Sequence, residues 1–173
     1  MNILKSALGH YEAVGNVADA DCVIGHSFGT LIGKGTANQD LADFILKNAD
    51  GRPVIADAML ADSFPYGRSA VDFVAEGPIS NLTASEGGSW NTLLFANSVM
   101  NNEGLSRPLM IAQAHHIGRV AMQAKKLGME SIVPENLPGT FDADSNQIWT
   151  RSLAMWVPRE VLGSFVLKKQ GKL

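Results

Sequence analysis

The sequence contains one cysteine, no long apolar run and no cluster of basic residues. Cys22 has no partner for an internal disulfide and lies in an apolar run, which favours a buried thiol in a reducing compartment. No segment approaches the roughly 20 apolar residues that a membrane-spanning helix needs. The N-terminus also lacks the continuous apolar centre of a signal peptide. We therefore expect a cytoplasmic protein without a membrane span.

The charged residues give no footprint for nucleic acid. The 173 residues carry a formal net charge of −3, and the only adjacent basic pairs are Lys125-Lys126 and Lys168-Lys169. A nucleic-acid interface normally needs basic residues gathered on one face, so no nucleic-acid partner is expected. With 46% hydrophobic and 18% charged residues, the composition predicts one soluble domain with a sizeable core, spanning residues 1–173.

Short apolar runs alternate along the chain with segments of helical periodicity. The runs predict strands at residues 21–25, 52–57, 78–83, 107–113 and 130–134. Helices are predicted at residues 39–47, 67–75, 89–102, 116–127 and 147–156. Buried strands separated by helices favour parallel pairing through crossover connections. We therefore predict an α/β, three-layer, Rossmann-like domain with a mostly parallel sheet of about five strands and helices on both faces.

Polar residues follow the predicted strands at the ends where the strands would meet. His26 and Ser27 follow the first strand, Asp57 follows the second, and residues 86–92 and 113–119 follow the third and fourth. In an open parallel sheet, ligands bind at the carboxyl ends of the strands, where the strand order reverses. The N–H groups that begin the following helices suit a phosphate or a carboxylate. The pattern predicts a polar pocket for a small anionic or nucleotide-like ligand.

The segment Gly25-His26-Ser27-Phe28-Gly29 fits the G-x-S-x-G pattern of the nucleophile elbow in α/β-hydrolases. That elbow follows several strands, whereas no strong strand precedes Ser27, so the topology argues against this fold. Smaller hydrolases of the SGNH type place their serine after the first strand, and Ser27, Asp57 and either His115 or His116 would share one rim. The alternative function is therefore hydrolysis of esters or phosphates. Otherwise Ser27 is a turn residue, and His116 is either a neutral donor to a carbonyl or a general acid or base.

Two separated motifs resemble the YdcF, SanA and ElyC family of bacterial proteins. That family pairs a Glu with a Ser-x-Asn-Thr helix start, and it places a His-x-x-Arg at the next junction of strand and helix. The residues at these positions are Glu86, Ser89, Asn91, Thr92, His116 and Arg119. Gly25 and Gly29 correspond to the family's glycine-rich turn, which lets a backbone approach a ligand closely. Where the family usually carries Ser-Gly-Gly after the second strand, this chain has Ala-Asp-Ala at residues 56–58.

The resemblance covers nearly the whole chain and implies a Rossmann-like fold with a small-ligand site. S-adenosylmethionine has been associated with one member and cell-envelope roles with others. Whether this protein is an enzyme stays open. An enzyme would be a hydrolase, from the Ser27 pattern, or an S-adenosylmethionine-dependent transferase, from the resemblance. The predicted ligand-binding residues are Gly25, His26, Asp57, Glu86, Ser89, Asn91, Thr92, His115 and Arg119, with Ser27 and His116 as catalytic candidates.

None of the candidate residues shows a recurring ligand spacing, so no metal site is predicted. The sequence leaves the oligomeric state open. A third possible function is that of a scaffold that binds another protein through the C-terminal segment.

Overall fold

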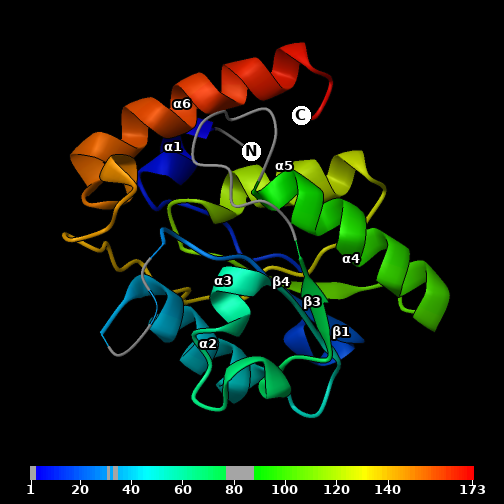
Figure 1. The fold of residues 1–173 in the computed structure, drawn as a ribbon. Coiled ribbons are helices and arrows are strands. Elements are labelled where there is room, and N and C mark those ends of the chain that lie inside the picture. Colours follow the sequence, from blue (N-terminus) through cyan, green and yellow to red (C-terminus); the bar gives the residue numbers. More distant parts are fainter. Residues whose placement is uncertain (1–2, 31, 33–34, 77–87) are drawn as a thin grey trace.

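A parallel sheet forms the centre of the computed structural model, which describes residues 3–30, 32, 35–76 and 88–173 (Figure 1). Its strands are β1 (Cys22–Gly25), β2 (Val54–Asp57), β3 (Phe73–Ala75) and β4 (Pro108–Ile111). They lie in the order β3-β2-β1-β4, and every neighbouring pair is parallel. The α/β fold is therefore confirmed. The prediction of five strands is wrong for the described residues, which form a 4-stranded sheet.

The third strand lies in a segment that was predicted to be helical. Of residues 67–75, only η2 (Gly67–Ala70) is helical, as a short 3₁₀ turn, and β3 follows it. Asp72 anchors this strand to β2, because its N–H donates to Val54 O at 3.0 Å and its carboxylate accepts from Val54 N at 2.8 Å. The Phe-Val pair that follows suits a strand better than a helix. The predicted strand at residues 78–83 lies outside the described residues.

The predicted fifth strand, at residues 130–134, is reduced to isolated bridges. Ile132 pairs in parallel with Leu109, and Val133 pairs antiparallel with Val14. Ile132 O accepts from Met110 N at 2.8 Å, and Ile132 N donates to Pro108 O at 2.9 Å. Pro134 follows directly and has no N–H to donate, so the ladder does not continue.

Three helices lie close to their predicted positions: the one after β1, the one before β4 and the one after β4. They are α2 (Ala37–Asn48), α4 (Ser89–Glu103) and α5 (Ile117–Lys126). Gly128, at a φ of 83°, follows α5 in the left-handed region that favours glycine after a helix. The structure adds three short helices that the periodicity did not predict: α1 (Ile3–Ala7), η1 (Val17–Asp19) and α3 (Ala58–Ala61).

The last helix, α6 (Leu153–Lys169), begins later and extends farther than the predicted 147–156. The first part of that range is instead the 3₁₀ turn η3 (Ile148–Thr150). Pro158 favours a helix end near Trp156, but it lies in the second turn of α6, and the helix continues beyond it. The reason is a continuous buried face at helical spacing, made by Trp156, Glu160, Gly163, Ser164 and Leu167.

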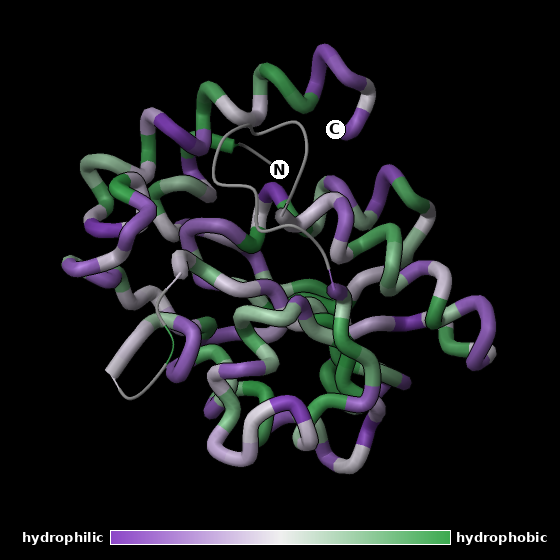
Figure 2. The backbone as a smooth tube through the Cα atoms, in the orientation of Figure 1, coloured by the Kyte–Doolittle hydropathy of each residue, from purple (hydrophilic) through white to green (hydrophobic). Residues whose placement is uncertain are grey.

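Helices cover both faces of the sheet. α2 lies on one side and α4 and α5 on the other, and α6 forms an outer layer over α1 (Figure 1). The strands between these layers are apolar, as the green tube at the centre of Figure 2 shows. The chain runs outward from β1 through β2 to β3 and then places β4 on the opposite side of β1. The strand order therefore reverses between β1 and β4, and their carboxyl ends mark the expected ligand site.

The structure bears on the reactivity of the single thiol and on the presence of a membrane-spanning helix. Cys22 is buried, and burial, reinforced by the charge of Asp21, raises the pKa of its thiol to about 12. Such a thiol is unreactive at neutral pH. Among the residues described, no helix combines the length and the apolar character needed to cross a membrane.

Candidate functional site

His26 lies at the carboxyl end of β1, where the strand order reverses, and its N–H donates to Ile111 O of β4 at 2.9 Å. The side chain is 1% exposed. Within the described residues, neither of its ring nitrogens has a hydrogen-bond partner. Burial, reinforced by electrostatic interactions with His116 and Arg119, lowers the pKa of His26 to about 3. The imidazole is therefore neutral at physiological pH and offers one donor and one acceptor.

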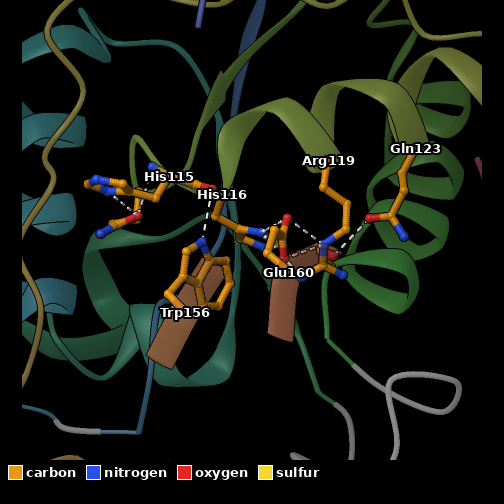
Figure 3. Close-up of polar contacts among 8 residues, drawn as sticks. His115, His116, Arg119, Gln123, Trp156 and Glu160 are labelled. Carbon is orange, nitrogen blue, oxygen red and sulfur yellow. Dashed lines mark hydrogen bonds and ion pairs between the residues drawn. The ribbon is translucent and has the colours of Figure 1, made fainter. Parts of the chain in front are cut away.

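An ion pair joins α5 to α6 (Figure 3). Arg119, in the first turn of α5, donates from Nε to Oε1 and Oε2 of Glu160 at 2.9 and 3.0 Å. Glu160 is 2% exposed. Burial opposes its ionisation, but the charge of Arg119 and the contacts with His116 outweigh that effect and lower the pKa of Glu160. The pair is therefore charged and ties α6 to the carboxyl end of β4.

His116 completes this network through Nδ1. This atom lies 3.3 Å from Nη2 of Arg119 and 3.5 Å from Oε1 of Glu160. Burial, together with the charge of Arg119, lowers the pKa of His116, so the ring is neutral at physiological pH. The shorter contact favours an Nδ1 that accepts from Arg119, which places the proton on Nε2. The ring also packs edge-on against Trp156, with the centroids 5.4 Å apart.

The neighbouring His115 points away from this network (Figure 3). Its Nδ1 lies 3.2 Å from Oε1 of Gln113, and its ring packs against Phe141 at 4.9 Å. Its backbone carbonyl accepts from Nε1 of Trp156 at 3.1 Å. The structure therefore brings His116 and Arg119 to one side and His115 to the other.

Ser27 and Asp57 form a separate pair. Asp57 Oδ2 accepts from Ser27 N at 2.8 Å, and Oδ1 accepts from Leu60 N at 3.1 Å, which caps α3. Burial raises the pKa of Asp57, although hydrogen bonds from Ser27 and the start of α3 oppose the rise. In the part of the chain that the structure describes, no hydrogen bond joins Ser27 to His116. The predicted triad of Ser27, Asp57 and a histidine is therefore represented among the described residues by the contact of Ser27 with Asp57.

The glycines at the end of β1 and in the turn after it have packing explanations. A Cβ on Gly25 would lie 2.6 Å from Leu60 Cδ2 and 2.7 Å from Ile45 Cδ1, so glycine lets α2 and α3 pack against the strand. Gly29 has a φ of 82°, and a Cβ there would lie 3.0 Å from Thr150 Oγ1. This turn does not cradle a phosphate with its first N–H groups, because those of residues 26–28 donate to Ile111 O, Asp57 Oδ2 and Asn38 Oδ1.

The start of α4 joins α5 rather than β1. Ser89 Oγ donates to Oε1 of Gln123 in α5 at 2.8 Å, and Thr92 Oγ1 lies 3.4 Å from Gly88 O. Asn91 is exposed in the same turn. Neither Gly88 before α4 nor His116 before α5 provides a side-chain cap. Glu86, the remaining predicted residue of this motif, lies outside the described residues.

Sequence reasoning did not identify Glu160 or Trp156 as parts of this region. The available signal was that Glu160 is the only acidic residue in the otherwise apolar and basic segment 153–173. A single acidic residue on the side of a helix that faces the core indicates an ion-pair partner elsewhere in the fold. Among the described residues, no group of three or more His, Cys, Asp or Glu side chains is placed to hold a metal ion.

Comparison of the chain with protein-family models, with curated proteins and with solved structures gave no match. The resemblance to the YdcF, SanA and ElyC proteins therefore stays a prediction.

Proposed function

We propose that this protein binds a small anionic or nucleotide-like ligand at the carboxyl ends of β1 and β4. The observation that carries the proposal is His26. Its buried ring has two nitrogens without partners among the described residues, at the position where α/β sheets bind their ligands. A buried polar group without a partner costs free energy, so such a group in a folded protein needs an explanation. A ligand that forms hydrogen bonds with His26 provides such an explanation.

The protonation state of His26 restricts the ligand. Because the pKa is lowered to about 3, the ring is not a cation that attracts an anion. It pairs with groups that donate and accept, such as the hydroxyls of a ribose. A nucleoside or nucleotide fits this requirement, and so does S-adenosylmethionine, which the resemblance suggests.

We assign the anionic part of the ligand to Arg119 and to the starts of α4 and α5. Arg119 uses Nε and Nη2 within the network with Glu160 and His116, and in the described part of the chain Nη1 is left for a ligand. The side chain of Arg119 is 15% exposed, whereas that of Glu160 is 3% exposed. The N–H groups at the starts of α4 and α5 add partial positive charge.

Isothermal titration calorimetry with AMP, S-adenosylmethionine and inorganic phosphate tests this function. Wild type should bind at least one of these probes, and His26→Leu should weaken that binding at least tenfold, which equals about 1.4 kcal/mol. His10→Leu removes an exposed histidine outside the site and serves as the matched control. Equal binding by wild type and His26→Leu, or no binding of any probe to wild type, would refute the proposal.

One observation favours hydrolysis by Ser27 as a second candidate function. Ser27 is only partly buried and lies against Asp57, whose pKa burial raises, so that this carboxylate can accept a proton from the hydroxyl. In this version Asp57, rather than His116, acts as the base. Labelling by a fluorophosphonate in wild type but not in Ser27→Ala would support it, and an absence of Ser27-dependent labelling would exclude a serine hydrolase of this kind.

A further inference from the structure

The outer side of α6 is apolar and exposed. Leu162 is 66% exposed and Phe165 is 63% exposed, and Val166 lies beside them. Phe165 and Val166 lie on the same side of the helix as Leu162, because they follow it by three and four positions. The opposite side is the buried face that contacts the rest of the protein. Figure 2 shows α6 along the outside of the molecule, with green turns among its purple ones.

A groove between α1 and α6 extends this apolar side. Its volume is about 270 Å³, and its lining is formed by Ile3, Leu4, Val161, Ser164, Phe165 and Lys168. Ser164 is buried, and within the described residues its hydroxyl has no hydrogen-bond partner. The groove is thus apolar along most of its length and carries a lysine at one position.

The charged residues of these two helices are nearly all basic. Lys5 lies in α1, and Lys168 and Lys169 form the last turn of α6. Arg159 stacks on Trp149 at 5.2 Å from the ring centroid. Glu160, the one acid in either helix, is buried against Arg119 and adds no negative charge to the surface. The α1/α6 face is therefore basic in a chain whose net charge is −3.

We propose that the α1/α6 face, defined by Leu4, Lys5, Leu162, Phe165, Val166, Lys168 and Lys169, binds the surface of an anionic lipid bilayer. Exposed apolar side chains on a helix with a basic polar side are typical of segments that lie in the membrane interface. The apolar side chains enter the boundary between headgroups and acyl chains, and the lysines reach the headgroup phosphates. This inference concerns a different face from the proposed ligand site and does not depend on that site.

Charge decides between a lipid surface and a second copy of the chain. A symmetric dimer through this face would place the same patch against itself, so Lys168 and Lys169 would approach the lysines of the other copy. An anionic surface is complementary to these charges instead. A lipid interface also accepts protruding side chains such as Leu162 and Phe165 without needing matched pockets.

Sedimentation with vesicles tests the proposal. Wild type should bind vesicles of phosphatidylcholine with about 30% phosphatidylglycerol at least tenfold more strongly than vesicles of phosphatidylcholine alone, and the binding should weaken as salt rises. Lys168→Glu with Lys169→Glu should reduce binding about 30-fold or more, which corresponds to about 1 kcal/mol for each lysine. Leu162→Glu with Phe165→Glu should reduce it at least tenfold. Leu46→Glu, on the exposed side of α2, is the matched control and should bind as wild type does.

Circular dichroism of each variant shows whether the fold is retained, and because every substituted residue is exposed, all are expected to fold. Undiminished binding by Leu162→Glu with Phe165→Glu, or no preference of wild type for anionic vesicles, would overturn the proposal. A wild-type dimer in solution that Leu162→Glu with Phe165→Glu dissociates, without vesicle binding, would assign the face to a second copy and would equally overturn it. Binding to an acidic protein without binding to vesicles would also overturn the proposal.

Discussion

Replacing His26 by leucine should stabilise the protein. Leucine is close to histidine in size, and it removes a donor and an acceptor that have no partners among the described residues. Leaving a buried polar group unpaired costs about 1–3 kcal/mol. We therefore expect His26→Leu to raise the free energy of unfolding by about 1–3 kcal/mol at pH 7.5, in contrast to the loss that most core substitutions cause.

The gain should grow as the pH falls. The pKa of His26 is lowered to about 3 in the folded protein from its ordinary value of 6.5. Between these two values the unfolded chain takes up a proton that the folded protein does not, so wild-type stability falls as the pH falls. The slope for one such group is about 1.4 kcal/mol per pH unit. Because leucine does not titrate, the advantage of His26→Leu at pH 5.5 should exceed that at pH 7.5 by about 1.4 kcal/mol.

Chemical denaturation of wild type and His26→Leu at both pH values measures this difference. A chain of this size shifts its melting temperature by about 2–4 °C for each kcal/mol, so thermal denaturation gives an independent reading. The same measurement on His10→Leu should show no stabilisation, since His10 is exposed. A His26→Leu variant that is less stable than wild type at pH 7.5, or a difference that does not change with pH, would refute the reasoning.

Two further substitutions test the network and the packing. Glu160→Gln should lower the free energy of unfolding by about 3 kcal/mol, because it leaves Arg119 without its buried partner. The pKa of Glu160 in the folded protein is lowered from 4.5, so its stabilising contribution is present above pH 4.5 and is lost as the pH falls through the folded value. Glu160→Gln should lack this loss of stability in acid. Urea denaturation measures the effect, and a change as small as that of the exposed control Glu103→Gln would contradict the account. Gly25→Ala should cost about 1–3 kcal/mol through overpacking against Leu60 and Ile45, and a variant with an unchanged melting temperature would show that these side chains move aside freely.

The sheet was predictable where apolar runs are continuous and bounded by turns. β1, β2 and β4 are such runs, and all of them lie within the predicted ranges. The α5 helix was equally clear, because its apolar side, terminal lysines and following glycine agree with one another. β3 was mistaken for part of a helix because it has only three residues, and its place is fixed by hydrogen bonds between Asp72 and Val54 rather than by its own pattern.

The position of the candidate site followed from topology, but its internal contacts did not. The ends of parallel strands converge, so the proximity of His26, His116 and Arg119 could be expected from their places after β1 and β4. Glu160 is 41 residues from Arg119, and no local pattern encodes a contact over that distance. The opposite directions of His115 and His116 depend on packing against Phe141 and Trp156, which the sequence does not reveal.

Nuclear magnetic resonance of ¹⁵N-histidine-labelled protein tests the assignment of His26 as a ligand contact most directly. The ring signals of His26 are identified by their absence from His26→Leu, and the protein is then titrated with AMP, S-adenosylmethionine and inorganic phosphate. We predict that a bound probe shifts the ring nitrogens of His26, because they gain hydrogen-bond partners, while those of the exposed His10 stay in place. Saturation by a probe with unchanged His26 signals, or the absence of binding by all three probes, would contradict the account.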